Sequence, residues 1–324
     1  MKKDNQDASR YSELGVSASK QGLHDALQRA GVESSAGFFA QLGPDIAGDP
    51  AYISLLHCDG AGTKALLAYL YACDTNDTSV YASLSQDALV MNLDDILCVG
   101  LPSGMSIANA ISRNARLIPD EAISRIIGRY KELVDSLNNL GFPLTMTGGE
   151  TADMGDVVRT LVVDATIAAR IPKDRLVDTR NICSGDVIIG LSSTGRASYE
   201  DSENSGIGSN GLTLARHALL TEDYLSLYPE VCDPQTAAEH RLRGPFRMTD
   251  LPSGLGMSIG KALLSPTRTY APVLRKVFES LGRDVHGVIH CTGGGQTKVL
   301  RFGPGSLKFI KDNLFPEPPV FRLI

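Results

Sequence analysis

The chain has 324 residues, of which 43% are hydrophobic and 21% are charged, a composition typical of a globular enzyme or binding protein that is long enough for two domains. The net charge of −6, without a basic stripe along the chain, argues against nucleic acid as the main partner. The polar N-terminus has no apolar signal core, and no apolar run is long enough to span a membrane. We therefore predict a cytoplasmic location.

Alternating strands and helices are predicted along the first half of the chain. Their patterns indicate strands at 51–58, 143–154 and 159–171 and helices at 79–100 and 118–141. The last of these helices has Pro119 at its start and Gly141 at its end. Polar residues at 173–186 then separate two apolar regions. This change in composition predicts an N-terminal domain over 1–175 and a C-terminal domain over 176–324.

The second half begins again with an apolar run that ends in small polar residues. Its predicted elements are strands at 186–195 and 285–295 and helices at 212–220 and 269–282. Segment 196–211 is rich in Ser, Asn, Glu and Gly, which is typical of a mobile surface loop. The tail ends on apolar residues, so we expect the C-terminal domain to be incomplete at its C-terminus.

Four predicted strand ends share one pattern, in which an apolar run leads into small polar residues and glycine, often with a carboxylate or lysine. They are "CDGAGTK" (58–64), "TGGETADM" (147–154), "SSTG" (192–195) and "HCTGGG" (290–295). The spacing of "CDGAGTK" fits neither the phosphate loop of P-loop enzymes nor the dinucleotide fingerprint. Glycines still allow a backbone to approach phosphate closely. We predict that Asp59 binds a metal ion, Gly60 and Gly62 let the chain turn, and Lys64 contacts phosphate.

Carboxylates within apolar segments support a metal site. Asp87, Asp94 and Asp95 lie in a predicted buried helix at a spacing close to two turns, so Asp87 can share a face with either of the others. Glu150 lies in the second glycine loop, and Asp164 interrupts an apolar strand. Buried carboxylates are costly unless they are paired or bound to metal. The alternatives are that the glycines only form turns and that Asp94 and Asp95 form a solvated or salt-bridged helix face.

His290 is the histidine most suggestive of function, because it stands at a predicted strand end before a threonine and three glycines. Its alternative is a packed histidine. Six cysteines, at positions 58, 73, 98, 183, 232 and 291, include no pair at the spacing of zinc or redox motifs. We expect them to be reduced and mostly packed, with Cys58 and Cys291 acting as small hydrophobic residues.

Several motifs in one order resemble the aminoimidazole ribonucleotide synthetase family, also called phosphoribosylformylglycinamidine cyclo-ligase, of purine biosynthesis. The motifs are "DGAGTK", "DALVMNLDDIL", "GGETADM", "GDVIIGLSSTG…SNGLTLAR", "SPTRTY" and "HCTGGG". The likeness runs from about Tyr11 to the end of the chain and is specific as a set. The wider superfamily includes thiamine monophosphate kinase and selenophosphate synthetase, which share the nucleotide-binding half.

The resemblance implies an α/β (α+β) two-domain subunit. Its N-terminal mixed sheet with helices would form a barrel across a homodimer, and its C-terminal domain would be α/β. ATP and Mg²⁺ would bind to the N-terminal domain near that interface. The substrate would be a phosphorylated ribonucleotide, formylglycinamidine ribonucleotide, whose imidazole ring is closed with release of ADP and phosphate. Neither nucleic acid nor a membrane is implied as a partner.

The motif positions imply specific roles for residues of this chain. The predicted catalytic residues are His290, Lys64 and Asp95. The predicted nucleotide-binding residues are Asp59, Gly60, Gly62, Thr63, Lys64, Gly148, Gly149, Glu150 and Thr151. The predicted substrate-binding residues are Asn210, Thr292, Gly293 and Gly294. The predicted metal ligands are Asp59, Asp87, Asp95, Glu150 and Asp164.

This chain departs from the family pattern at several points. The family usually has Asn-Asp where this chain has Asp94-Asp95, and a valine in place of Ala61; the segments 196–205 and 221–264 are longer than usual. Two alternatives to the cyclo-ligase stay open at the level of sequence. One is another ATP-dependent superfamily member, similar to thiamine monophosphate kinase or selenophosphate synthetase, and the other is a non-catalytic nucleotide-binding relative.

Overall fold

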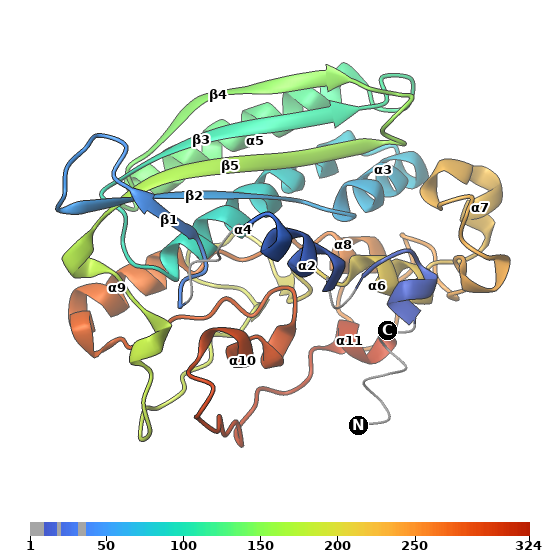
Figure 1. Cartoon of the computed structure of the whole chain (residues 1–324). Helices are drawn as coiled ribbons and strands as arrows, with labels where there is room; N and C mark the ends of the chain where they lie inside the picture. The colour runs from blue at the N-terminus through green and yellow to red at the C-terminus, as the bar shows by residue number, and fades with distance from the viewer. Residues whose placement is uncertain (1–9, 18–20, 32–36) are drawn as a thin grey trace.

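The computed structural model describes residues 10–17, 21–31 and 37–324, so parts of the predicted N-terminal domain lie outside the described residues. Within that described part, no helix combines the length and apolarity needed to cross a membrane. The chain order of elements starts with α2 (Gln21–Arg29) and continues into a sheet covered by helices (Figure 1).

A five-stranded mixed sheet is the centre of the first half. Its strands are β1 (Gln41–Pro44), β2 (Tyr52–Gly60), β3 (Gly104–Arg113), β4 (Leu144–Asp153) and β5 (Leu161–Pro172). The strand order is β1-β2-β5-β3-β4, in which β3 and β4 run parallel and the other neighbours are antiparallel. The predicted strands at 51–58, 143–154 and 159–171 are confirmed. No strand was predicted over β3, whose small polar residues hide its alternation.

One face of the sheet is covered by helices, and the opposite face is open. The helices are α3 (Lys64–Thr75), α4 (Ser83–Leu97) and α5 (Asp120–Asn139), with the short 3₁₀ turn η1 (Thr78–Ala82) between the first two. Along β5, Val163, Ala165 and Ile167 are buried toward the helices, while Val162 and Asp164 alternate onto the open face. Figure 1 shows α5 behind the strands. The period of two therefore separates an apolar face from a partly exposed one.

Helices α4 and α5 confirm the two helices predicted at 79–100 and 118–141. Helix α5 is amphipathic and begins with Asp120 and Glu121, where negative charge stabilises the helix N-terminus. Helix α4 is buried on nearly all sides, because it lies between the sheet and the second half of the chain. This central position puts its polar side chains in contact with segments that are distant in sequence.

The second half is built mainly from helices and irregular segments. Its helices are α6 (Leu212–Leu219), α7 (Asp223–Leu227), α8 (Ile259–Leu263), α9 (Ala271–Leu281), α10 (Val299–Phe302) and α11 (Pro319–Leu323). Helices α6 and α9 confirm the predicted helices. The segment 221–264 packs against α3, where the Tyr224 hydroxyl donates to Asp74 at 2.6 Å. Buried residues of both halves form one continuous cluster. The division at residues 175 and 176 stays a prediction.

The strands predicted at 186–195 and 285–295 are wrong over most of their length. The described residues of the second half form only a two-stranded ladder, β6 (Thr194–Gly195) with β7 (Asn204–Ser205). A strand needs a neighbour for its backbone hydrogen bonds, and no strand lies beside Val187 and Ile189, which are 88% and 80% exposed.

Two further expectations about exposure are corrected. The loop predicted as a surface segment at 196–211 contains Asn204 and Ser205, which are buried because both bond to backbone carbonyls of the segment 262–266. The cysteines are not mostly packed. Cys98 and Cys232 are buried, whereas the other four are exposed because they lie on the open sheet face, on a helix surface or in loops.

Candidate active site

Three buried carboxylates on α4 bind segments of the second half that are distant in sequence. Asp87, Asp94 and Asp95 are 0%, 2% and 7% exposed. The segments that they contact contain the motifs "SNG", "SPTRTY" and "HCTGGG". The sequence spacing predicted that Asp87 can share a helix face with Asp94 or Asp95. In the folded chain, α4 contacts all three of these motifs.

Asp87 forms a fully buried ion pair with Lys64. The Lys64 Nζ donates to Asp87 Oδ1 at 2.7 Å and to the Ser265 carbonyl at 2.7 Å. The same carboxylate oxygen accepts from Ser209 and from the backbone and hydroxyl of Thr267. Burial lowers the pKa of Lys64, and the Asp87 charge opposes this effect. The other oxygen, Oδ2, is buried without a hydrogen-bond partner among the described residues.

Asp94 holds the start of α9. Its Oδ1 accepts from the Thr269 hydroxyl at 2.7 Å, and its Oδ2 accepts from the Tyr270 N–H at 2.8 Å. Burial raises the pKa of Asp94 to about 6, because the charged form is desolvated and these hydrogen bonds offset only part of the cost. Of the neighbouring carboxylates, Asp94 is therefore the one that resists ionisation.

Asp95 lies between two histidines from different parts of the chain. Its Oδ1 is 2.7 Å from His290 Nδ1, and its Oδ2 is 3.3 Å from His57 Nε2. Although burial raises the pKa of Asp95, the hydrogen bonds from both histidines outweigh it and hold the pKa well below the usual range. An ionised carboxylate only accepts hydrogen bonds, so Nδ1 of His290 carries the proton and its Nε2 is left to exchange one.

His57 belongs to this cluster and was missed by sequence reasoning. Its Nδ1 is 2.9 Å from Asn92 Oδ1, while Asn92 Nδ2 donates to backbone carbonyls, including that of Asp59. The amide is thereby oriented so that His57 Nδ1 must donate to it. Burial lowers the pKa of His57, but Asp95 outweighs this and raises it overall. His57 directly precedes the "CDGAGTK" motif, and only its position at the end of a strand could have suggested a role.

The first glycine loop brings Asp59 close to Asp164. The Gly60 N–H donates to Asp59 Oδ1 at 2.7 Å. A side chain at Gly60 would clash, because its Cβ would lie 2.7 Å from the Val163 carbonyl oxygen and 1.8 Å from Asp164 Oδ1. Burial raises the pKa of Asp164, and the charge of Asp59 raises it further. The charge of Asp59 thus acts on a half-buried Asp164, and a divalent cation would relieve both the burial cost and this repulsion.

Glu150 lies on the open face of the sheet, apart from the α4 cluster. In the strand register Glu150 is opposite Ala110, which is opposite Asp164, so the two carboxylates share a face but are separated by one strand. The other nucleotide-binding residues predicted on β4, namely Gly148, Gly149 and Thr151, are exposed. The five predicted metal ligands therefore do not converge on one point.

The predicted substrate-binding residues lie together. A Cβ on Gly293 would be 3.5 Å from Asn210 Oδ1, which places the "SNG" asparagine against the triple glycine. Gly293 and Gly294 have φ angles of +57° and +135°, which L side chains rarely adopt. The Thr292 N–H donates to the His290 carbonyl at 2.8 Å. The loop thus begins directly at the histidine that contacts Asp95.

The remaining predicted residues of the first loop flank the start of α3. Gly62 has a φ of +55°, so it makes the turn that sequence predicted. Thr63 precedes α3, and its hydroxyl accepts from Thr213 at 3.4 Å. The first glycine loop and α6 are therefore in contact next to the buried Lys64.

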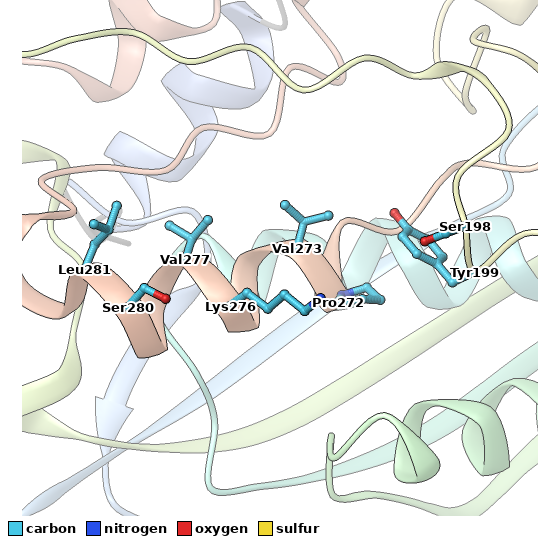
Figure 2. Close-up of a pocket in the computed structure, with 8 residues that line it drawn as sticks. All are labelled: Ser198, Tyr199, Pro272, Val273, Lys276, Val277, Ser280 and Leu281. Carbon is cyan, nitrogen blue, oxygen red and sulfur yellow. The ribbon is translucent and has the colours of Figure 1, made fainter.

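A surface hollow of about 440 Å³ lies apart from these residues. Figure 2 shows that it runs along α9 and ends beside Ser198 and Tyr199. Its lining is mostly apolar, and Lys276 supplies a positive charge. None of the predicted site residues lines it. The Tyr199 hydroxyl donates to the Thr269 carbonyl at 2.8 Å, so the hollow borders the segment that Asp94 anchors.

Comparisons with known proteins agree with this arrangement of motifs. Residues 47–171 match the family described as "AIR synthase related protein, N-terminal domain". A protein of Methanothermobacter thermautotrophicus named phosphoribosylformylglycinamidine cyclo-ligase is 33% identical over 316 residues, covering 96% of this chain and 77% of the relative. A protein of the same name from Methanocaldococcus jannaschii is 28% identical, covering 88% of this chain and 68% of the relative.

Among solved structures, thiamine monophosphate kinase from Aquifex aeolicus matches with a TM-score of 0.36 and 14% identity. The match covers 51% of this chain and 46% of that protein, so the chain spans about half the length of this structural relative.

Proposed function

The chain belongs to the phosphoribosylformylglycinamidine cyclo-ligase family, and we propose that it closes the imidazole ring of formylglycinamidine ribonucleotide, with ATP converted to ADP and phosphate. The observation that carries this proposal is the 33% identity to a cyclo-ligase over 96% of the chain. It is supported by the contact between His290 and Asp95, which joins motifs from both halves at one buried point. The reaction belongs to purine biosynthesis, for which a cytoplasmic location is expected.

Two chemical tasks define the reaction. An amide oxygen is a poor leaving group, so it must first accept the γ-phosphoryl group; the oxygen then leaves as phosphate when the neighbouring nitrogen attacks the same carbon. That nitrogen loses a proton as the ring closes. We assign the proton to Nε2 of His290, because Asp95 holds the proton of this ring on Nδ1. His57 lies on the other side of Asp95, whose charge raises the pKa of this histidine.

Asp59 and Asp164 are the residues that we expect to hold Mg²⁺. They are the neighbouring carboxylates whose repulsion a cation would relieve, and oxygen ligands suit this ion. The bound ion would neutralise phosphate charge. Asp87 and Lys64 are already paired in the folded chain, so Lys64 could reach phosphate only by leaving Asp87 and the Ser265 carbonyl. Its phosphate role, like the metal role of Glu150, stays a prediction.

The open face of the sheet supports the proposed homodimer. Leu56 and Val162 are 58% and 39% exposed on this face, where they alternate with small residues such as Ala110. An apolar sheet face of this kind is stabilised when another surface covers it. Two copies packed through it would form the barrel expected of the family. Glu150 and Asp164 share this face, so the nucleotide would lie near the interface.

The test is to supply ATP with formylglycinamidine ribonucleotide and to measure both ADP release and the aminoimidazole product. Thiamine monophosphate with ATP serves as the second arm. We expect product and ADP in equal amounts in the first arm only. ADP release confined to the thiamine monophosphate arm would replace the proposal with a kinase, and ATP binding without turnover in either arm would indicate a non-catalytic relative.

A further inference from the structure

A second cluster of metal-ligating side chains lies outside the candidate active site. Cys183, Asp186 and His286 each offer a ligand atom, and these atoms all lie within 4.8 Å of one another. The His286 Nδ1 is 2.9 Å from Asp186 Oδ2 and 4.0 Å from Cys183 Sγ, and the thiol donates to Asp186 Oδ1 at 3.3 Å. All three side chains are at least partly exposed, so an ion in solution can reach them.

The chain builds this cluster with a tight turn. The Asp186 N–H donates to the Cys183 carbonyl, and the Cys183 N–H donates to Asp186 Oδ2 at 2.9 Å. Gly185 has a φ of +100°, which closes the turn at little steric cost. The thiol and carboxylate are therefore held on the same side of the turn before any ion binds.

Close packing brings the histidine to this turn from a segment 100 residues later. A Cβ on Gly287 would lie 2.7 Å from Ile182 Cδ1 and 2.9 Å from Ile182 Cγ1, which shows how closely the two segments approach. Ile182, which precedes Cys183, is thus in direct contact with Gly287, which follows His286. This contact fixes the position of His286 relative to Cys183.

A nucleophilic triad does not fit these positions. In such a triad the carboxylate contacts one ring nitrogen of the histidine and the nucleophile contacts the other. Here the thiol and the carboxylate both face Nδ1 of His286. Three different ligand atoms around one point are instead the arrangement of a metal centre.

We propose that Cys183, Asp186 and His286 form a binding site for Zn²⁺ or a similar borderline transition-metal ion, with water in the fourth position. Zinc accepts thiolate, carboxylate and imidazole ligands at about 2.0–2.3 Å in tetrahedral geometry, which separates ligands by about 3.5 Å. The observed separations bracket this value. Mg²⁺ is a poor fit because it prefers oxygen ligands.

The charge at this site also suits a divalent ion. A thiolate, a carboxylate and a neutral imidazole balance the charge of Zn²⁺. Without metal, the hydrogen bond to Asp186 raises the pKa of the Cys183 thiol, so the ion must displace that proton and binding should tighten as pH rises. A bound ion would tie the 183–186 turn to the segment that continues to His290. The site does not depend on the proposed function.

The experiment titrates the full chain with Co²⁺, a spectroscopic substitute for Zn²⁺, in buffer with excess Mg²⁺ to occupy oxygen-only sites. We expect one equivalent to give a thiolate-to-cobalt charge-transfer band that Zn²⁺ abolishes. Cys183→Ser should remove the band, and His286→Ala should weaken binding at least about tenfold. The matched controls are Cys73→Ser and His240→Ala, which change an exposed thiol and another histidine. Both controls should retain the charge-transfer band and the parent affinity.

Three results would overturn the proposal: no band in the parent, a band that persists in Cys183→Ser, or equal loss in a control variant. Circular dichroism of each variant shows that the chain is folded. Asp186→Asn is a second variant that keeps the thiol and should still weaken Zn²⁺ binding at least about tenfold. An unchanged affinity in this variant would remove Asp186 from the site.

Discussion

Asp95 and His290, 195 residues apart in the chain, are joined by a contact of 2.7 Å between Oδ1 and Nδ1. Asp95 comes from the helix at the centre of the fold, and His290 begins the triple-glycine loop. The contact fixes the tautomer of the imidazole as well as its place, because an ionised carboxylate requires a donor. It therefore links the folding of the second half to the tautomer and orientation of the histidine.

His290→Ala should slow ring closure by ~10²–10⁴-fold while Mg·ATP binding stays near normal, because the loss of a general base affects turnover. Asp95→Asn should lower kcat as well and move the pH profile, since the amide no longer holds the Nδ1 proton as a charged acceptor. The double variant should be little slower than His290→Ala alone, because the two residues act as a unit. Steady-state rates across pH and calorimetry measure these effects.

A packing role for His290 makes different predictions. Activity per folded molecule would then stay near the parent value in His290→Ala, while the melting temperature falls. His240→Ala provides the matched control, because His240 is a partly exposed histidine whose nearest acidic partner is Glu13.

Removal of one member of the Lys64–Asp87 pair should destabilise the chain strongly. Both side chains are fully buried, so Asp87→Asn leaves the lysine charge without its partner and should cost about 3–5 kcal/mol in urea unfolding. Lys64→Met combined with Asp87→Asn should recover much of that loss. Asp223→Asn in the exposed pair with Arg247 is the control and should cost less than about 1 kcal/mol. Strictly additive losses in the double variant would contradict a coupled pair.

Asp59→Asn and Asp164→Asn should each weaken Mg·ATP binding at least about tenfold if these carboxylates hold the ion. Isothermal titration of Mg·ATP measures the change, and Asp201→Asn, at an exposed position, is the control. In the absence of Mg²⁺, Asp164→Asn should also stabilise the fold, because it removes the burial of a charge and the repulsion by Asp59 that together raise the pKa of Asp164. Affinity equal to that of the control in both variants would end this metal assignment.

Local sequence patterns predicted the strands and helices whose buried faces are marked by a regular spacing of apolar residues. The strand ending at Pro172 and the helix from Asp120 are examples, because alternation or a 3.6-residue period marks their buried faces. The run at 186–193 is also apolar, but no strand among the described residues lies beside it. Whether a neighbouring strand is present cannot be predicted from the composition of the run.

The residues of the site could be predicted in part, but the contacts between them could not. The motifs identified Asp95 and His290, yet their contact and the participation of His57 depend on tertiary packing. Lys64 was expected to face phosphate, and its burial against Asp87 follows from the way in which Ser265 closes over it. Residue type therefore indicated the chemistry, while pairing depended on the fold.

The homodimer proposal predicts a mass of about twice the 34.6 kDa of the chain by light scattering. Leu56→Glu places a charge on the open sheet face and should shift the chain toward monomer without loss of helical signal. Leu227→Glu is the matched control, because Leu227 is 54% exposed on α7, away from the sheet. A parent that is monomeric while it binds Mg·ATP would contradict the barrel.

Asp94→Asn should stabilise the chain, and the gain should grow with pH. The folded pKa of about 6 lies above the ordinary 3.8, so the folded state binds more protons than the unfolded state between these values. Stability therefore falls as pH rises from about 4 to 6 and reaches a penalty of about 3 kcal/mol above that range. Asparagine removes the penalty and can still accept from Tyr270 while its amide donates to the Thr269 hydroxyl.

Substitution of the neighbouring carboxylate, Asp95, should change stability in the opposite direction in the same experiment. The pKa of Asp95 is held low by His290 and His57, so its ionised form stabilises the fold above the ordinary pKa and that contribution is lost as the pH falls. Thermal melts at pH 4, 5, 6 and 7.5 should therefore show Asp94→Asn gaining on the parent up to about pH 6 and then holding a constant lead. Asp95→Asn should be less stable than the parent throughout this range, because the range lies above the ordinary carboxyl pKa. His57 titrates in both the parent and the Asp94 variant, so the difference between their curves isolates Asp94. A lead that is the same at pH 4 and pH 7.5 would show that the ionisation of Asp94 does not limit stability.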